Sequence, residues 1–363
     1  MRLIMIGAVA AGTSAAAKAR RNNEDAEIII YERDSYISYS GCGMPYYIGG
    51  EVESLDELVP RDPAYFKSNY NVDIFILHEV LSINTHEKTL EIKNLSTGVI
   101  FKDSYDKLVI ATGARAIIPP IKGTDRGNAF TLRNINDMNK IKSFIQLNNP
   151  KFVVILGTGF VGLEVCENLK VLGIDVTLIE KLTQVTPGLD SDMAIYVKEY
   201  LEKNSITVLT GVSAIEITQD YVILSDGKII KSDMVLISTG VRPNTELAKQ
   251  AGIKIGVTGA IKVDEKMRTN IENIYACGDC IEQFNLVTGK PVYRPHGSTA
   301  NKTGRIAGDS MTGGSLTFRG ILGTGILKLF DMVVAQTSLS ERTIRENGSR
   351  EYINYFLILM SYL

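Results

Sequence analysis

Cys42 is the residue of this chain whose type and surroundings are most suited to redox chemistry. It lies between Gly41 and Gly43, and Pro45 can open a short helix directly after it. A thiol near a helix N-terminus is stabilised as the thiolate, which is its reactive form. No other cysteine lies between residues 1 and 149, so the oxidised form would be a mixed disulfide with a small thiol or a sulfenic acid. We interpret Cys42 as the catalytic residue rather than a packing cysteine.

The other cysteines, Cys166, Cys277 and Cys280, are better explained as core residues. Cys277 and Cys280 form a C-x-x-C pair, but no second such pair and no nearby histidine completes a zinc site. The chain has only three histidines. We therefore expect no metal, and we expect these thiols to pack in the interior.

Two glycine-rich turns follow apolar strands and open helices. In the first module the strand is 3–6, the turn runs from Gly7 to Gly12, and the acid is Glu32. In the second module the strand is 152–156, the turn runs from Gly157 to Gly162, and the acid is Glu180. Each acid ends the strand after the helix, 20 residues past the last glycine in the first module and 18 in the second. The dinucleotide fingerprint expects about 20. The glycines allow a tight turn, and the helix N-terminus attracts the phosphates. The first turn has Val9 where the middle glycine is usual.

Composition supports an ordinary globular protein of more than one domain. The chain has 363 residues, 45% of them apolar and 22% charged, with a net charge of −2. This charge suggests neither nucleic acid nor an anionic membrane as a partner. No apolar run reaches the roughly 20 residues of a membrane span. The N-terminal residues read as strand, turn and helix rather than a signal peptide, so we expect a cytoplasmic protein.

Two fingerprints imply two dinucleotides, and FAD at one site with a nicotinamide dinucleotide at the other is the economical choice. We predict an α/β fold with two Rossmann-like domains and mainly parallel sheets. The expected FAD-binding domain is residues 1–115 plus 245–320, and the NAD(P)-binding domain is 116–244.

Three further segments carry a resemblance to a known superfamily. A strand ends in Ala111-Thr112-Gly113, the segment Thr239 to Asn244 echoes that turn, and another strand ends in Gly278-Asp279. Together they resemble the two-dinucleotide flavoprotein disulfide reductases. The segment from Ser38 to Gly50 is similar to their single-cysteine branch, which contains coenzyme A disulfide reductases, NADH oxidases, NADH peroxidases and persulfide reductases. The resemblance extends from residue 1 to about 340.

The resemblance implies a reaction. NAD(P)H would reduce the flavin, and electrons would pass through Cys42 to coenzyme A disulfide or a related small disulfide or persulfide, in cell redox homeostasis. An NADH oxidase or peroxidase working through a sulfenic acid is the alternative. Those members typically carry a histidine in the first glycine loop, where this chain has Ala10. A third possibility is an inactive remnant that holds FAD.

The resemblance also implies site residues. Those for FAD are Gly7, Ala8, Ala11, Gly12, Glu32, Arg33, Val80, Ala111, Thr112, Gly113 and Asp279. Those for NAD(P) are Gly157, Gly159, Phe160, Val161, Gly162, Glu180 and Gly240. Those for the substrate are Lys18, Arg21, Ser38 and Gly41, although Lys18 and Arg21 are equally well explained as an ordinary solvated helix face. The carboxylate of Glu180 favours NADH, while Lys181 leaves NADPH open.

The chain departs from the superfamily pattern at two places. The superfamily pattern has a basic residue before the next strand, where this chain has Tyr70. The resemblance fades after Arg345, so it implies only a partial α+β interface domain, a dimerisation domain at residues 321–363 that is expected to be incomplete. Members of the branch are homodimers, and dimerisation of this chain stays open.

Overall fold

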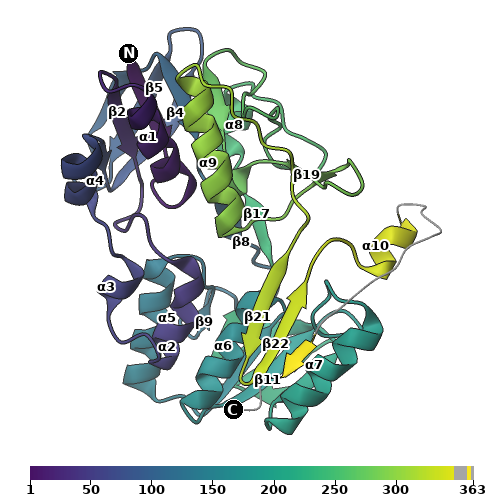
Figure 1. Cartoon of the computed structure of the whole chain (residues 1–363). Coiled ribbons are helices and arrows are strands. Elements are labelled where there is room, and N and C mark those ends of the chain that lie inside the picture. Colours follow the sequence, from purple (N-terminus) through teal and green to yellow (C-terminus); the bar gives the residue numbers. More distant parts are fainter. Residues whose placement is uncertain (347–357, 361–363) are drawn as a thin grey trace. The chain divides into compact units, whose positions relative to one another are not determined.

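The computed structural model describes residues 1–346 and 358–360. They form two compact units, which are treated separately below (Figure 1). The first unit is Met1–Ser40, Leu58–Arg115 and Arg242–Ile321, and the second is Gly41–Glu57, Ala116–Val241 and Leu322–Leu363. Three short elements lie where the chain passes between units: α3 (Leu55–Leu58), β8 (Ala114–Ala116) and β17 (Val241–Pro243).

The first unit is built on a parallel sheet of strand order β18-β7-β1-β2-β3. Its strands are short, apolar and rich in isoleucine, as expected of strands covered on both faces. The elements are β1 (Arg2–Ile6), α1 (Ala11–Asn22), β2 (Glu27–Tyr31), α4 (Pro63–Tyr70), β3 (Asp73–Phe75), β4 (His78–Asn84), β5 (Thr89–Asn94), β6 (Ile100–Ser104), β7 (Lys107–Ile110), α8 (Glu246–Gln250), β18 (Ile274–Ala276), the 3₁₀ turn η2 (Gly278–Cys280), β19 (Gln283–Phe284), β20 (Pro291–Val292) and α9 (Gly297–Met311).

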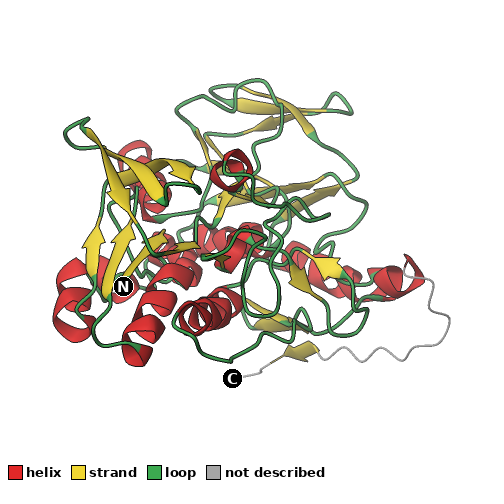
Figure 2. Ribbon diagram, turned by 90° about the horizontal axis from the view of Figure 1, so that it is seen from above, coloured by secondary structure: helices red, strands yellow, loops and turns green. Residues whose placement is uncertain are grey.

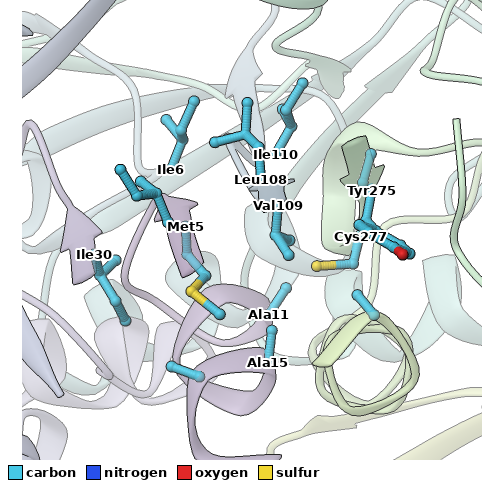
Figure 3. Close-up of a cluster of buried hydrophobic side chains, with 14 of the residues drawn as sticks. Met5, Ile6, Ala11, Ala15, Ile30, Leu108, Val109, Ile110, Tyr275 and Cys277 are labelled. Carbon is cyan, nitrogen blue, oxygen red and sulfur yellow. The ribbon is translucent and has the colours of Figure 1, made fainter. Parts of the chain in front are cut away.

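Small residues let the helices of the first unit pack closely. Ala11 and Ala15 of α1 face the sheet core around Met5 and Val109 (Figure 3). On the facing helix α9, a Cβ at Gly304 would lie 2.3 Å from the Ala11 carbonyl oxygen, and one at Gly308 would lie 2.2 Å from that of Ala15. The glycines of α9 are thus required by its contact with α1.

The second unit repeats this plan with strand order β12-β11-β10-β16-β9, again parallel. Figure 2 colours the helices red and the strands yellow. The elements are η1 (Gly41–Gly43), α2 (Met44–Gly49), β9 (Ala129–Phe130), α5 (Ile135–Asn148), β10 (Phe152–Leu156), α6 (Phe160–Val171), β11 (Asp175–Glu180), α7 (Ser191–Lys203), β12 (Thr207–Thr210), β13 (Ala214–Ile217), β14 (Tyr221–Leu224), β15 (Ile229–Lys231), β16 (Met234–Ile237), β21 (Gly325–Leu329), β22 (Met332–Gln336), α10 (Glu341–Glu346) and β23 (Ile358–Met360).

The two sheets are equivalent strand by strand. The order β3-β2-β1-β7-β18 in the first sheet corresponds to β12-β11-β10-β16-β9 in the second. In each unit a separate three-stranded antiparallel sheet comes, in chain order, between two strands of the parallel sheet: β4–β6 in the first unit and β13–β15 in the second. Both parallel sheets are doubly wound, with helices between successive strands. This confirms the predicted α/β fold with two Rossmann-like sheets.

The segment Gly41–Glu57 groups with the second unit, whereas the sequence-based boundaries place it within residues 1–115. The reason is its packing on α6. A Cβ at Gly49 would lie 2.1 Å from Oδ1 of Asn168, so α2 and α6 are in close contact there. The assignment of each stretch to an FAD or an NAD(P) domain stays a prediction.

Part of the predicted dimerisation domain, residues 347–357 and 361–363, lies outside the described residues. Of the rest, β21 and β22 form an antiparallel hairpin joined by β23. Among the residues that the structure describes, no helix has the length and apolar character needed to cross a bilayer.

Candidate functional site

The first glycine turn is closed by the side chain of Glu32, which follows β2. Its carboxylate accepts hydrogen bonds from the backbone N–H of Ala8 at 2.7 Å and of Asp34 at 2.8 Å. Burial raises the pKa of Glu32, and the two backbone donors oppose that shift. A Cβ at Gly12 would lie 1.8 Å from the Gly7 carbonyl oxygen, so the turn requires glycine at position 12.

The predicted FAD residues gather at the carboxyl ends of four neighbouring strands. Gly7 follows β1, Glu32 follows β2 and Ala111 follows β7, while Asp279 lies in η2 just after β18. A Cβ at Gly278 would lie 2.7 Å from the Cβ of Ala11, which places η2 beside the start of α1. Ligands of doubly wound sheets bind at this edge.

The start of α1 suits a phosphate. Ala10 provides no side-chain cap, and the first turn of α1 carries no acid. By contrast, α4 and α5 are capped by the side chains of Asp62 and Asn134. The backbone N–H groups at the start of α1 are therefore not blocked by a capping side chain, and the residues present fit a dinucleotide.

The turn Ala111-Thr112-Gly113 is held by Asn244. The sequence indicated Asn244 only as the last residue of the similar segment Thr239 to Asn244. The hydroxyl of Thr112 donates to the Asn244 carbonyl at 2.8 Å, and the Asn244 amide donates to the Thr112 carbonyl at 2.8 Å. The backbone N–H of Asn244 donates to the carbonyl of Gly113 at 2.9 Å. Of the other predicted FAD residues, Val80 packs partly buried on the core of this unit and Arg33 is exposed.

The second glycine turn repeats the arrangement of the first. The carboxylate of Glu180 accepts from the N–H of Thr158 at 3.0 Å, from its hydroxyl at 2.8 Å and from the N–H of Leu182 at 2.9 Å. A Cβ at Gly162 would lie 2.3 Å from the Gly157 carbonyl oxygen. Thr158 was missed because the fingerprint specifies only the glycines and the acid.

The start of α6 also suits a phosphate, because Gly159 supplies no side-chain cap and the first turn has no acid. Phe160 and Val161, which open the helix, are 38% and 41% exposed, so they are accessible to a ligand within this unit. Gly240, with φ +110°, follows β16 at the same edge, where its carbonyl accepts from the N–H of Ile117 at 2.9 Å. The structure thus brings all predicted NAD(P) residues to one edge of the second sheet.

Cys42 lies in the 3₁₀ turn η1 and is exposed. Helix α2 follows at once with Pro45 in its first turn, which confirms the predicted short helix, and it ends at Gly50 with φ +88°. The ammonium of Lys142 on α5 donates to the Tyr47 carbonyl at 2.9 Å and lies 3.4 Å from the centre of the Tyr47 ring. Lys142 therefore holds the C-terminal end of α2 through a hydrogen bond and a cation–π contact.

Ionisable groups of α2 and α6 influence one another. Burial raises the pKa of Tyr46 to about 12, and the negative charges of Glu164, Glu167 and Cys42 add to this shift. Burial also raises the pKa of Glu164 to about 7, with a further contribution from Glu167. Near neutral pH the Tyr46 phenol is protonated and Glu164 is partly protonated. Sequence spacing gave no signal for this group, because it arises from the packing of two helices.

The remaining cysteines are buried, which confirms their predicted packing role. The thiol of Cys280 lies 3.2 Å from the Cys277 carbonyl oxygen, and burial raises its pKa to about 11. Burial also raises the pKa values of Cys277 and Cys166. No group of three histidine, cysteine or acidic side chains suited to a metal occurs within residues 1–346 and 358–360.

The predicted substrate residues divide between the units. Gly41 belongs to the second unit, whereas Lys18, Arg21 and Ser38 belong to the first. Lys18 forms an ion pair with Asp309 on α9 at 3.1 Å. Arg21 is exposed, and the backbone N–H of Ser38 donates to the carbonyl of Ala8 at 2.9 Å. Their role toward a substrate stays a prediction.

Comparison with known proteins decides the family. The sequence model of the family described as pyridine nucleotide-disulphide oxidoreductase matches residues 1–295. This chain belongs to that family. It is 40% identical to an NADH oxidase of Methanocaldococcus jannaschii over 94% of this chain and 76% of that protein. It is 32% identical to a coenzyme A disulfide reductase of Staphylococcus haemolyticus over 93% of this chain and 76% of that protein.

Among solved structures, an NAD-dependent persulfide reductase from A. fulgidus aligns with a TM-score of 0.93 and 40% identity. The alignment covers 96% of this chain and 66% of that one. The family membership confirms the predicted resemblance, an oxidoreductase fold and the pairing of FAD with NADH or NADPH. The individual site residues stay predictions.

Proposed function

We propose that this protein is an FAD-dependent oxidoreductase that uses NADH to reduce a small disulfide, coenzyme A disulfide in the first instance, through Cys42. The observation that carries the proposal is the contrast among the thiols, because Cys42 is exposed on a glycine-flanked turn while the other three are buried. When bound, FAD supplies the acceptor for hydride and the donor of electrons to sulfur.

Cys42 carries out the exchange. Its thiolate attacks one sulfur of the disulfide, so that an Sγ–S bond forms, the substrate S–S bond breaks and one thiolate leaves to take up a proton. Two electrons and a proton then break the mixed disulfide, release the second thiol and restore the Cys42 thiolate. The sum is one disulfide and NADH with one proton giving two thiols and NAD⁺. With no second cysteine from residue 1 to residue 149, the mixed disulfide is the oxidised form that this step leaves.

The second glycine turn would hold the pyridine nucleotide. The uncapped start of α6 receives the pyrophosphate, and Glu180 reads the ribose. The Glu180 carboxylate already accepts three hydrogen bonds, and a carboxylate offers about four acceptor positions. The remaining position suits a ribose hydroxyl, while a 2′-phosphate would meet a like charge, so NADH is the expected reductant.

An exposed positive charge supports a substrate that contains coenzyme A, and the state of the thiols supports a cytoplasmic location. The exposed guanidinium of Arg21 is a better candidate for a coenzyme A phosphate than Lys18, whose charge already pairs with Asp309. Three buried thiols without a disulfide among the described residues are in keeping with a reducing cytoplasm.

An NADH oxidase is the second candidate, because the Methanocaldococcus jannaschii relative at 40% identity has that name. In that reaction peroxide, formed from oxygen by two-electron reduction or supplied as such, would transfer one oxygen atom to the Cys42 thiolate to give a sulfenic acid and leave as water. Ala10 in the first turn offers no proton-transfer group there, which favours the disulfide as acceptor.

Rapid mixing distinguishes these activities. The holoenzyme is reduced anaerobically with one equivalent of NADH and then mixed with coenzyme A disulfide, oxygen or hydrogen peroxide. We expect fast recovery of flavin absorbance with the disulfide, and Cys42→Ser should remove it while flavin content is unchanged. Recovery with oxygen or peroxide alone would favour the oxidase. Reduction with no recovery would show an inactive remnant.

A further inference from the structure

The turn that carries Asp279 is held by contacts from three other parts of the first unit. This turn, η2, has only three residues and follows β18 at the edge where the predicted FAD residues gather. Its own backbone bond, from the N–H of Ile281 to the carbonyl of Gly278, is long at 3.3 Å. Gly278 has φ +81°, and a Cβ there would lie 2.7 Å from the Cβ of Ala11. The position of the Asp279 carboxylate therefore depends on what holds η2 from outside.

The first contact is made by the hydroxyl of Tyr293, which donates to the main-chain carbonyl of Asp279 at 2.9 Å. Tyr293 directly follows β20, and its backbone is fixed on both sides. Before it, Val292 pairs with Gln283 across the β19–β20 hairpin. After it, the N–H of Arg294 donates to the buried side-chain oxygen of Gln283 at 2.9 Å. The phenol therefore reaches Asp279 from a well-held segment.

The second contact is made by the thiol of Cys280. Its Sγ lies 3.2 Å from the Cys277 carbonyl oxygen after β18 and 3.5 Å from the Ile110 carbonyl oxygen at the end of β7. Ile110 and Cys277 are neighbours on these two strand ends, joined by a backbone hydrogen bond of 3.0 Å (Figure 3). Hydrogen bonding from Thr112 and Gly113 opposes the effect of burial on the pKa of this thiol. One side chain thus contacts both turns predicted to bind FAD, the one after β7 and the one after β18.

The third contact comes from α9. The N–H of Gly278 donates to the hydroxyl of Thr303 at 3.1 Å, and that buried hydroxyl donates in turn to the Thr299 carbonyl at 2.8 Å. Each residue of η2 is therefore held by a different partner, including Asp279 at its main chain. None of these three contacts uses the Asp279 carboxylate, which is the group that the resemblance assigns to FAD.

We propose that Tyr293 and Cys280 are positioning residues of the FAD site, which hold η2 so that the Asp279 carboxylate is in place to accept hydrogen bonds from the cofactor. A group that is held in its binding position beforehand loses less conformational freedom on binding, so fixing it raises affinity. The inference rests on the proposed function, because it takes the carboxyl edge of the first sheet as the FAD site. It adds two residues that neither glycine fingerprint contains.

The test measures FAD affinity directly. Dilution of the holoenzyme, followed by the fluorescence of the released flavin, gives the Kd and the release rate of FAD. Tyr293→Phe removes the hydroxyl alone, and we expect it to weaken FAD binding about three- to ten-fold, the value of one neutral hydrogen bond. Saturating FAD should restore the native kcat and leave the KM for NADH unchanged. Tyr105→Phe is the matched control, because it removes a buried phenol hydroxyl just before β7, at the opposite end of that strand, and should not change the Kd.

Cys280 is tested by two substitutions that differ by one hydroxyl. Cys280→Ala removes the group that contacts both turns, while Cys280→Ser keeps a hydrogen-bond donor and acceptor there. We expect the Ala variant to bind FAD about three- to ten-fold more weakly and the Ser variant to bind within about two-fold of the native protein. Cys277→Ala is the matched control, because its buried thiol takes no part in the three contacts. It should lower stability, as the loss of a buried side chain does, without changing the Kd for FAD.

A double-mutant cycle distinguishes positioning from general stability. Asp279→Ala removes the carboxylate that Tyr293 is proposed to position. In that background Tyr293→Phe should change the FAD affinity by less than about two-fold, because no carboxylate is left to place. A merely structural role for Tyr293 would give the same loss with and without the carboxylate.

Native FAD affinity in Tyr293→Phe or in Cys280→Ala would overturn the role of that residue. Losses shared by the Tyr105→Phe and Cys277→Ala controls would overturn the proposal, as would a full loss from Tyr293→Phe in the Asp279→Ala background. A failure of the proposed function is distinct. It would appear in the native holoenzyme as flavin that NADH does not reduce or that coenzyme A disulfide does not reoxidise, with these FAD affinities unchanged.

Discussion

The two glycine turns of this protein place an acid in the same position and differ in the residue beside it. In both, the carboxylate after the second strand accepts from the residue that follows the first glycine. In the first turn that residue is Ala8, which offers only its backbone N–H, and in the second it is Thr158, which adds its hydroxyl. The acid therefore holds the glycine turn by hydrogen bonds in both units. The residue after the first glycine, Ala8 or Thr158, determines how many acceptor positions of the carboxylate remain unused.

The helices after the turns differ as well. Two residues past the last glycine, α1 has Ser14 and α6 has Glu164. The Ser14 hydroxyl accepts from the Asn301 amide at 2.9 Å on α9, whereas burial raises the pKa of Glu164 to about 7. A repeated backbone thus carries a neutral packing contact in one unit and an acid that titrates near neutrality in the other.

The largest expected effect comes from the last glycine of each turn. Gly12→Ala should cost about 3 kcal/mol or more, because its Cβ would lie 1.8 Å from a backbone oxygen that cannot move freely. Gly162→Ala should cost less, since its corresponding contact is 2.3 Å. Denaturant unfolding measures both, with Gly127→Ala as control because nothing lies within 4 Å of a Cβ there. Equal small losses in all three would show that the turns are not tightly closed.

The next effect is a pH dependence that arises from Glu164 on α6. The pKa of Glu164 in the folded protein is about 7, above its ordinary value of 4.5, so the folded state binds the proton more tightly than the unfolded state. Its contribution to stability is present below pH 4.5 and is lost as the pH rises through 7.

Glu164→Gln should therefore flatten the stability profile between those pH values, by about 1–3 kcal/mol. Urea unfolding at successive pH values measures the profile. Ser14→Ala at the equivalent place on α1 should leave the slope unchanged, and a slope retained in the Glu164→Gln protein would assign the titration to another group.

A smaller effect distinguishes the two strand-end turns. Asn244→Ala removes an amide donor to Thr112 and should cost about 1–2 kcal/mol. Thr239→Val in the equivalent turn of the second unit removes one exposed hydroxyl bond to Ile117 and should cost less than 1 kcal/mol. Thermal unfolding of both variants tests this ranking. A larger loss for Thr239→Val than for Asn244→Ala would show that these hydrogen bonds do not determine the stability of the two turns.

A similarly small effect comes from making the second turn like the first. Thr158→Ala removes the hydroxyl donor to Glu180 and leaves the backbone N–H bond, as in the pair of Ala8 and Glu32. We expect a loss of about 0.5–1.5 kcal/mol in stability and a change of only a few-fold in the KM for NADH. A loss of all nucleotide binding would mean that the hydroxyl contacts the nucleotide rather than the acid.

Local pattern was enough to predict the sheets and the turns. The glycine spacing and the apolar strands placed both modules, and the observed strand β2 ends at Tyr31, one residue before the predicted Glu32. These features follow from neighbouring residues alone. By contrast, the grouping of Gly41–Glu57 with the second unit depends on the contact of Gly49 with Asn168, more than a hundred residues away in the chain.

The parts of the site that sequence missed share this long-range origin. The pKa of Glu164 is raised by burial and by the charge of Glu167, and that burial arises when α6 packs against other elements. Gln336 contacts the Gly188 carbonyl because β22 lies against the loop after β11, and no fingerprint spans that separation. Sequence pattern located the two glycine turns and singled out Cys42, which the structure shows to be exposed, while packing determined the groups around them.

The most direct test of the account is the fate of Cys42 during turnover. The holoenzyme, with its flavin oxidised and Cys42 as the free thiol, is treated with one equivalent of coenzyme A disulfide. Samples taken before and after addition of NADH are digested and analysed by mass spectrometry. We predict one coenzyme A adduct, on the peptide that contains Cys42, and its complete release by NADH. An adduct on a buried cysteine, or an adduct at Cys42 that NADH leaves in place, would contradict electron transfer through this thiol.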